Sequence, residues 1–323
     1  MVAGSGWKVT SISWAVAGGL AALAAVRVTE ADRLRRAEVP AVALVSFTPQ
    51  VAAAAPWAAL GLRLAGRRGP AVTAAVAGAV LSWVVRSRGN PRPQPAAVGP
   101  VLRVVTCNVY FGQADAEVIV GLVRKSDADV LFLQELTADA VTRLKQAGLD
   151  DLMPHTRLDL RGGPRGSGIY SRYPLGDGPA VPPTTMAHPS ALLQLPRGDK
   201  VELVCVHPVA PGLRRWGGAA RWRDELGLLP PPGQLPRVVA GDFNASLDHA
   251  TFRAVLALGY ADAAQQAGKA LTPTWGPPGR ERAVLTLDHV LVDPGCAVLD
   301  YSVNYVPRSD HRAVYAEIQL PGR

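Results

Sequence analysis

The pattern of hydrophobic and polar positions divides the chain into an apolar first part and a longer part where short apolar runs alternate with amphipathic stretches. Three stretches without a charged residue open the sequence, at 9–26, 39–62 and 69–85. A helix needs about 20 apolar residues, and no fewer than about 17, to cross the hydrocarbon core of a bilayer. We therefore predict an N-terminal membrane region, residues 1–86, that holds a bundle of about three transmembrane helices.

The apolar stretches also fit two structures besides membrane helices. A cleaved signal peptide fits the length of the first stretch, although Lys8 is the only basic residue before it and two further apolar stretches follow. A bundle of soluble helices needs a polar face on each helix, and these stretches have almost none. The pattern favours membrane helices, with Trp14, Trp57 and Trp83 as candidate anchors at the membrane interfaces.

The second part of the chain has the pattern of a domain that mixes helices and strands. The segment 87–100 is rich in proline and polar residues, which is typical of an extended linker. Beyond it, β-branched and apolar runs predict strands at 102–107, 130–134, 167–171, 201–206, 237–241, 287–292 and 313–319. Amphipathic stretches predict helices at 115–125, 138–147, 217–228 and 249–257. The alternation predicts an α/β domain over residues 101–323.

The formal net charge of +8 lies entirely in the first hundred residues. Residues 1–100 carry 11 basic and 3 acidic residues, whereas residues 101–323 carry 23 of each. A strong nucleic-acid binder usually has a basic footprint on the domain that binds. The neutral charge of residues 101–323 therefore argues against a strong nucleic-acid binder. A local basic patch on this part of the chain remains an alternative.

The basic residues also bear on the orientation in the membrane. The loop after the first stretch and the segment after the third carry seven basic residues, and the N-terminal tail and second loop carry four. The positive-inside rule counts basic residues next to the spans. Taken alone, this count places the C-terminal domain in the cytoplasm.

Polar side chains follow or flank the predicted strands, where α/β domains keep their functional sites. They are Asn108, Glu135, His207, Asp242, Asn244, Asp288, His289, Asp310 and His311. Each residue type also has an ordinary structural role: Asn108 suits a turn, Asp242 and Asn244 suit a helix cap, and a lone histidine is commonly part of a core. The occurrence of such residues at five different strand ends favours a common site.

These residue types suit the hydrolysis of phosphoesters. A carboxylate such as Glu135 can hold Mg²⁺, which prefers oxygen ligands and offsets charge on phosphoryl oxygens. An aspartate can orient and deprotonate a water molecule, and imidazoles can donate to developing negative charge. An aspartate such as Asp288 would fix the tautomer of His311 by accepting a hydrogen bond from its ring.

The motifs resemble those of the endonuclease/exonuclease/phosphatase superfamily, whose fold is the DNase I-like fold. The resemblance covers essentially all of 101–323 and rests on TCNVYFG, LFLQEL, GSGIYSRYPL, VCVHP, GDFNA, LDHVLV and SDHRAV, in that order. It implies a four-layer α/β sandwich in which two mixed β-sheets are flanked by helices. It further implies that Asn108, Glu135 and Asp310 hold Mg²⁺ or Mn²⁺. Asp242 and Asn244 would align the attacking water, and His207 and His311 would bind phosphoryl oxygens.

The substrate is suggested by the membrane region together with a second resemblance. An apolar N-terminal region followed by this domain is similar to the VanJ-type teicoplanin-resistance proteins. That resemblance implies a lipid-linked substrate such as a polyprenyl pyrophosphate, hydrolysed outside the membrane, which is the side opposite to the one that the charge count gives.

Arg214 and Arg215 are candidate contacts to anionic lipid headgroups or to a pyrophosphate. A solvated helix face, with the neighbouring tryptophans in the core, is the alternative for this segment. Two further functions stay open for the whole protein: a membrane-attached nuclease, and a non-catalytic membrane protein with a degenerate domain.

Overall fold

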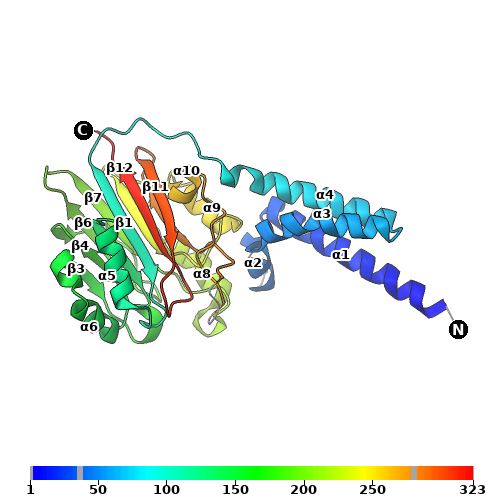
Figure 1. Cartoon of the computed structure of the whole chain (residues 1–323), viewed down its shortest axis with the longest axis horizontal. Coiled ribbons are helices and arrows are strands. Elements are labelled where there is room, and N and C mark those ends of the chain that lie inside the picture. Colours follow the sequence, from blue (N-terminus) through cyan, green and yellow to red (C-terminus); the bar gives the residue numbers. More distant parts are fainter. Residues whose placement is uncertain (1–2, 35–38, 278–281, 323) are drawn as a thin grey trace. The chain divides into compact units, whose positions relative to one another are not determined.

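In the computed structural model, which describes residues 3–34, 39–277 and 282–322, the chain divides into two units (Figure 1). The first unit runs to Arg88 and includes the short segment Leu247–Thr251. The second unit consists of Gly89–Ser246 and Phe252–Arg323. Residues 90–98 have no regular secondary structure. In this part of the second unit, the backbone nitrogen of Arg92 donates to the carbonyl oxygen of Gln266.

The first unit is helical, and its helices differ in one respect from those predicted. They are α1 (Ala3–Thr29), α2 (Val39–Val45), α3 (Thr48–Leu64) and α4 (Arg68–Val85), with short 3-10 turns η1 (Ala31–Arg33) and η2 (Arg86–Gly89). The prediction of one continuous helix over 39–62 is wrong, because α2 ends at Val45 and a new helix begins at Thr48. Pro49 has no N–H to donate to the carbonyl oxygen of Val45, so it cannot continue α2, whereas the first turn of a new helix tolerates it.

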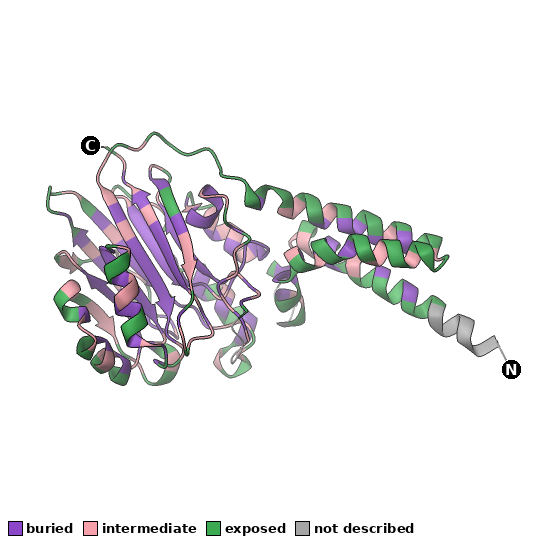
Figure 2. Cartoon of the chain, viewed as in Figure 1, coloured by how far each residue is buried: buried purple, intermediate pink, exposed green. Residues whose placement is uncertain are grey.

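Within the described residues, two segments are long and apolar enough to span a membrane, Thr10–Thr29 and Arg68–Gly89. The predicted bundle of three spanning helices is therefore not confirmed. The helices α3 and α4 approach closely where Gly78 faces Ala55, since a Cβ on Gly78 would come within 2.7 Å of the Ala55 methyl group. The faces turned away from this contact carry exposed apolar side chains, and Figure 2 shows how little of the helical surface is buried.

A buried ion cluster lies inside the first unit. Asp248 accepts hydrogen bonds from both terminal nitrogens of Arg88, at 2.7 and 2.6 Å, and from Nε of Arg27 at 2.8 Å. Burial alone would raise the pKa of Asp248, but the two guanidinium groups lower it below its ordinary value. Two of the seven basic residues in the orientation count are thus paired with a buried carboxylate, and a third, Arg33, pairs with Glu30 at 3.3 Å. Two others, Arg35 and Arg36, lie outside the described residues.

The second unit contains two six-stranded mixed sheets that pack face to face (Figure 1). The first has the order β11-β12-β1-β2-β4-β3, and the second β5-β6-β7-β8-β10-β9. The strands of the first are β1 (Val101–Asn108), β2 (Val130–Gln134), β3 (His155–Asp159), β4 (Ser167–Ser171), β11 (Ala297–Asn304) and β12 (Ala313–Gln319). Those of the second are β5 (Leu175–Asp177), β6 (Ser190–Gln194), β7 (Lys200–Val206), β8 (Arg237–Asp242), β9 (Ala261–Asp262) and β10 (Asp288–Val292).

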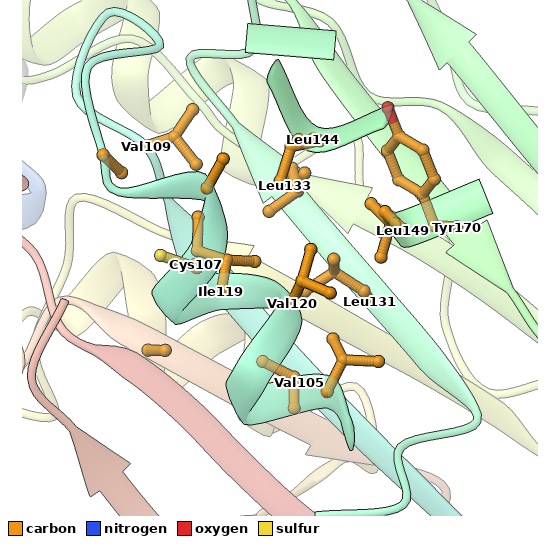
Figure 3. Close-up of a cluster of buried hydrophobic side chains, with 14 of the residues drawn as sticks. Val105, Cys107, Val109, Ile119, Val120, Leu131, Leu133, Leu144, Leu149 and Tyr170 are labelled. Atoms are coloured by element: carbon orange, nitrogen blue, oxygen red, sulfur yellow. The ribbon is translucent and has the colours of Figure 1, made fainter. Parts of the chain in front are cut away.

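Helices cover the outer faces of both sheets, as a four-layer α/β sandwich requires. They are α5 (Ala116–Lys125), α6 (Ala138–Gln146), α7 (Leu149–Leu152), α8 (Gly218–Leu226), α9 (Ala250–Leu256) and α10 (Ala263–Gln266), together with the turns η3 (Gly163–Arg165) and η4 (Arg214–Trp216). Figure 3 shows one of the resulting cores, where Ile119 and Val120 of α5 meet Val105 and Leu131 of β1 and β2. The predicted DNase I-like arrangement of two mixed sheets flanked by helices is confirmed.

Candidate active site

The registers of the two sheets bring the chemically active residues to one edge. Strands β1 and β2 are parallel with Asn108 opposite Gln134, so Asn108 and Glu135 lie at the same end. Strands β7 and β8 are also parallel, with Val206 opposite Gly241, which places His207 beside Asp242. The fit of β8 to β7 requires glycine at 241, because a Cβ there would overlap the carbonyl oxygen of Val206. Strand β10 is antiparallel to β8 and sets Asp288 directly opposite Asp242.

Asn108 connects the two sheets through its side-chain amide. Its Nδ2 donates to Oε1 of Glu135 at 3.2 Å and to Oδ2 of Asp242 at 3.1 Å. Its Oδ1 accepts from the backbone nitrogen of Tyr110 at 2.9 Å. Asn108 is fully buried, so it holds one carboxylate from each sheet in a fixed relation and is more than a turn residue.

Glu135 is held by the backbone in an unusual conformation. Its φ is 57°, in the left-handed region that costs a residue with a side chain about 1–3 kcal/mol. Its Oε2 accepts from the backbone nitrogen of Phe111 at 2.8 Å. Burial raises the pKa of Glu135 to about 7, against the opposing effect of these hydrogen bonds. The strain and the poor solvation indicate a functional position for this carboxylate.

Asp242 lies at the centre of the group. Its Oδ1 accepts from the backbone nitrogen of Asn244 at 2.7 Å. Its Oδ2 lies 3.8 Å from Nε2 of His207 and 3.6 Å from Nε2 of His311. Burial raises the pKa of Asp242, while His311 acts in the opposite direction. Asn244 has a φ of 49° and donates from Nδ2 to the carbonyl oxygen of Pro208 at 3.1 Å, which fixes its amide.

His311 is bound through its Nδ1 to Asp288, as the sequence predicted. Asp288 is itself held by Thr274, whose hydroxyl donates to Oδ2 at 2.6 Å and accepts from the backbone nitrogens of Leu287 and Asp288 at 3.0 Å. Burial disfavours the charged imidazole, but Asp288 and Asp242 outweigh it and raise the pKa of His311 to about 10. The imidazole is therefore cationic at neutral pH, with Nε2–H directed toward Asp242.

Three contributors to the site were not predicted. Thr274 orients Asp288, and Trp275 donates from Nε1 to Oδ2 of Asp310 at 3.1 Å. Ser309 donates to the carbonyl oxygen of Asn108 at 2.7 Å and accepts from the backbone nitrogen of His311 at 3.1 Å. The sequence signals are slight: Ser309 opens the SDHRAV motif, while Thr274 and Trp275 stand in a proline-rich segment with no strand pattern.

The two ring nitrogens of His207 have different surroundings, because Nε2 faces the carboxylates of the site and Nδ1 points away from them. Its Nε2 lies 4.0 Å from Oε1 of Glu135 in addition to its approach to Asp242. Its Nδ1 is buried without a hydrogen-bond partner among the described residues. Burial lowers the pKa of His207 to about 4, so the ring is neutral. A neutral ring donates from Nε2 in one tautomer only.

His289 belongs to the core. Its Nδ1 lies 2.7 Å from Oδ2 of Asp262 and its Nε2 lies 2.9 Å from the carbonyl oxygen of Ala245. The ring of Phe252 packs against it with centroids 4.3 Å apart. Both nitrogens are used, so the ordinary structural role of a lone histidine, as part of a core, holds for His289.

Arg214 and Arg215 lie on the turn η4 and are exposed. The guanidinium group of Arg215 stacks on the ring of Trp216, 4.3 Å from its centroid. Trp222, on α8, is buried and donates from Nε1 to the carbonyl oxygen of Phe243 at 3.1 Å. This tryptophan is a core residue, as the alternative for the segment predicted. It ties the helix after the two arginines to the GDFN loop of the site.

A protein-family model described as the endonuclease/exonuclease/phosphatase family matches residues 105–311, which is more than half of the chain. The chain belongs to the endonuclease/exonuclease/phosphatase family. Members of this family are metal-dependent phosphoester hydrolases, and this protein is an enzyme of that class.

Solved structures with the same fold extend the comparison. An endonuclease/exonuclease/phosphatase from Beutenbergia cavernae has a TM-score of 0.55 at 22% identity, over 69% of this chain and 72% of that one. TDP2 of D. rerio has a TM-score of 0.52 at 18% identity, over 68% of this chain and 98% of that chain. The mannosyl-6-phosphatase of Bacteroides thetaiotaomicron has a TM-score of 0.51 at 20% identity, over 67% of this chain and 99% of that chain. At these identities the likeness concerns the fold alone. No curated protein matches the sequence.

The residues of this family member fit a divalent cation. Oδ1 of Asp310 is buried and has no hydrogen-bond partner among the described residues, while its Oδ2 is held by Trp275. Burial raises the pKa of Asp310 as well as that of Glu135, so these carboxylates lack enough positive charge around them. Asp242 and Asp288 add two buried carboxylates close to each other in the same site. Hard carboxylate and amide oxygens in this number suit Mg²⁺ or Mn²⁺.

Proposed function

We propose that this enzyme is a membrane-anchored, Mg²⁺- or Mn²⁺-dependent phosphatase or phosphodiesterase that acts on a lipid-linked phosphate or pyrophosphate, such as a polyprenyl pyrophosphate. The observation that carries the hydrolytic part is the link from Asn108 to one carboxylate of each sheet. It gathers a cation site and a water-activating carboxylate within one hydrogen-bonded group. The observation that carries the lipid part is the exposed apolar surface of the helical unit.

Glu135, Asn108 and Asp310 would hold the metal ion. Asn108 would coordinate through Oδ1, since its Nδ2 already donates to the two carboxylates. A bound divalent cation would neutralise charge on the phosphoryl oxygens and stabilise the leaving oxygen. Trp275 keeps Oδ2 of Asp310 occupied and so leaves Oδ1 for coordination.

The remaining residues would act on the water and the phosphoryl group. Asp242 would align the attacking water and accept its proton at Oδ2, the oxygen that lies near Nε2 of both His207 and His311. Asn244 would contact the water and a phosphoryl oxygen. His311, cationic and fixed by Asp288, would donate from Nε2 to the negative charge that develops on phosphoryl oxygens. His207 would donate to a second oxygen.

The helical unit supports attachment to a bilayer. Large apolar side chains along its helices are exposed, including Trp57 at 74%, Val72 at 64% and Trp83 at 62%. Soluble proteins rarely expose contiguous apolar surface beyond a few hundred Å². Helices with satisfied backbones and apolar outer faces suit lipid contact. A lipid-linked substrate would then be concentrated beside the enzyme, and Arg214 and Arg215 would bind its anionic headgroup.

We place the catalytic domain on the extracytoplasmic side of the membrane. This choice follows the similarity to the VanJ-type proteins, whose implied substrate is handled outside the membrane, and it opposes the count of basic residues. The pairing of Arg27 and Arg88 with Asp248 weakens that count as a description of the free charge near the helices.

A nuclease is the second candidate. It is favoured by the similarity in fold to D. rerio TDP2, which was crystallised with a single-strand DNA product. The equal numbers of acidic and basic residues over 101–323 argue against it, since binding to a polyanion is dominated by basic residues. The contacts that link the candidate catalytic and metal-binding residues support an active enzyme over a non-catalytic protein; these residues are Asn108, Glu135, His207, Asp242, Asp288, Asp310 and His311.

Phosphate release from a polyprenyl pyrophosphate tests the proposal. The purified full-length enzyme would be assayed in detergent with Mg²⁺, and in parallel with EDTA, with the Asp242→Ala variant and with plasmid DNA. Release that needs the metal and Asp242, with the DNA intact, is the expected result. Nicking of DNA without phosphate release would replace the lipid assignment by the nuclease while leaving the site unchanged.

A further inference from the structure

The loop between β1 and α5 carries two aromatic residues in left-handed backbone. Tyr110 has a φ of 45°, Phe111 of 53° and Gly112 of 75°. The loop leaves the core at Val109, which is buried among residues of β1, β2 and α5 (Figure 3). Left-handed backbone costs free energy for a residue with a side chain, and a bulky side chain is rarely found there. Two consecutive aromatic residues in this conformation indicate a functional role for the loop.

Hydrogen bonds fix this loop to two of the candidate metal-binding residues. The backbone nitrogen of Tyr110 donates to Oδ1 of Asn108 at 2.9 Å. The backbone nitrogen of Phe111 donates to Oε2 of Glu135 at 2.8 Å. The left-handed conformation therefore directs two adjacent N–H groups at the site. Asparagine or glycine would direct them with less strain, so the backbone does not explain why residue 111 is phenylalanine.

Packing inside the domain accounts for only part of the Phe111 side chain. The side chain is 45% exposed, and its ring meets the ring of Tyr110 edge-on with centroids 5.4 Å apart. The nitrogen of the same residue touches Glu135, so the ring lies within one side-chain length of the position proposed for the metal. Ligand sites combine aromatic and apolar side chains with a few placed polar groups. The exposed ring of Phe111 supplies the apolar part beside a polar site.

Phe111 lies on the side of the site where the leaving group departs. In-line displacement puts the attacking water and the leaving oxygen on opposite sides of the phosphorus. Under the proposed function, Asp242 aligns the water, whereas Glu135 holds the cation that stabilises the leaving oxygen. Asn108 keeps these two carboxylates in separate places by donating to both from Nδ2. Because Phe111 is hydrogen-bonded to Glu135, it belongs to the half of the site away from the water.

We propose that Phe111 is a specificity residue that contacts the first apolar units of a polyprenyl chain on the leaving phosphate. In the hydrolysis of a lipid pyrophosphate, the oxygen of water bonds to the terminal phosphorus, and the bond from that phosphorus to the bridging oxygen breaks. Asp242 takes the proton of the water, and the leaving group is the lipid monophosphate that carries the chain. The inference rests on the proposed function and extends it to the part of the substrate that distinguishes a lipid.

Chain-length selectivity measures this contact. The full-length enzyme in detergent with Mg²⁺ would be assayed on farnesyl pyrophosphate and on isopentenyl pyrophosphate, which differ in the length of the apolar chain. Phe111→Asn removes the ring and keeps a residue that adopts left-handed backbone. We expect the ratio of kcat/KM, farnesyl over isopentenyl, to fall about 10-fold or more, since one apolar contact changes a specificity ratio by about that factor. Phe111→Leu retains an apolar side chain and should keep most of the ratio.

Ligand binding gives a readout that does not depend on turnover. Farnesyl monophosphate, the lipid product, should raise the unfolding midpoint of the parent enzyme and of Phe111→Leu, because a ligand that binds only the folded state stabilises it. The rise should be smaller in Phe111→Asn at the same concentrations of ligand and detergent. Inorganic phosphate, which lacks the chain, should shift the midpoints of all three proteins equally.

The matched control is Leu258→Asn. Leu258 is 43% exposed and lies close in sequence to Tyr260, whose hydroxyl contacts Arg237 at the other end of β8 from Asp242. Its substitution should leave the selectivity ratio and the midpoint shifts at their parental values. An unchanged ratio in a folded Phe111→Asn variant would overturn the proposal. An equal loss on both pyrophosphates would also overturn it, since the ring would then act on the site and not on the chain.

Failure of the proposed function gives a different result. A parent enzyme that hydrolyses both pyrophosphates, with a ratio that Phe111→Asn leaves unchanged, would reject the role of Phe111 alone. A parent enzyme that hydrolyses neither pyrophosphate and nicks DNA would remove the lipid substrate and this inference with it. Phe111 would then be a ring on which a base stacks, and Phe111→Leu would lose activity on DNA as Phe111→Asn does.

Discussion

Nδ1 of His311 lies 3.1 Å from Oδ1 and 2.9 Å from Oδ2 of Asp288, and both side chains are buried. The pair connects the last motif of the chain to the strand opposite Asp242. Asp288→Asn keeps the size of the side chain but removes the charge that holds the His311 proton. We expect kcat to fall by about 10- to 100-fold, a typical effect of losing an orienting carboxylate. The measurement is metal-dependent phosphate release at saturating substrate.

The matched control for this substitution is Asp177→Asn. Asp177 is a surface residue at the end of β5, paired with Arg157, and its loss should leave kcat unchanged. Equal activity of Asp288→Asn and the parent enzyme would show that His311 does not depend on Asp288.

Trp275 is expected to tune the affinity for the metal. Its Nε1–H occupies Oδ2 of Asp310, and Trp275→Phe removes this donor while keeping an aromatic ring. The Mg²⁺ concentration for half-maximal activity should rise about 10-fold, with kcat recovered at saturating Mg²⁺. Trp83→Phe, on the exposed face of α4, is the control. An unchanged Mg²⁺ dependence in Trp275→Phe would contradict the assignment of Asp310 to the metal.

The core pair of His289 and Asp262 predicts a pH dependence of stability. Burial alone would lower the pKa of His289, but Asp262 raises it above the ordinary value of 6.5. The folded state therefore holds a proton that the unfolded state releases. The stabilisation is complete below about pH 6.5 and is lost as the pH rises through the raised pKa. Its size is about 1.4 kcal/mol for each tenfold gain in the proton affinity of the ring on folding.

His289→Gln does not titrate in this range, so it isolates that contribution. The gap in unfolding midpoint between the parent protein and His289→Gln, followed by tryptophan fluorescence, should be larger at about pH 5.5 than at about pH 8.5. A gap that stays constant or grows with pH would show that the pair is not charged in the folded state.

Arg214 and Arg215 distinguish a membrane-embedded substrate from a soluble one. Replacing both with Ala should weaken activity on a polyprenyl pyrophosphate in anionic vesicles, since about 1 kcal/mol is associated with each basic residue near an anionic surface. Activity on a small soluble phosphoester should be unchanged. An equal loss on both substrates would remove the lipid role and indicate damage to the site through the adjacent helix.

The sequence predicted the strands that carry the site and the longer helices outside the sheets, but it missed several short and edge elements. Strands β2, β4 and β12 have the predicted bounds, and every residue of β2 and β4 is buried. Strand β3 (HTRLD) was missed because it lies at a sheet edge, where polar residues are tolerated and no apolar run forms. The break between α2 and α3 was missed because hydropathy does not detect the N–H that a proline lacks.

The sequence by itself determined the residue types at the strand ends, and hence a site for a hard cation and a phosphoester. The alternation of buried runs and polar ends also determined that Asn108, Glu135, His207 and Asp242 share one edge. The tertiary structure alone decided which atoms meet. It set Trp275 on Asp310, left Nδ1 of His207 without a partner among the described residues and buried Glu135 enough to raise its pKa. These properties depend on distances and desolvation between segments far apart in the chain, which no local pattern of residues encodes.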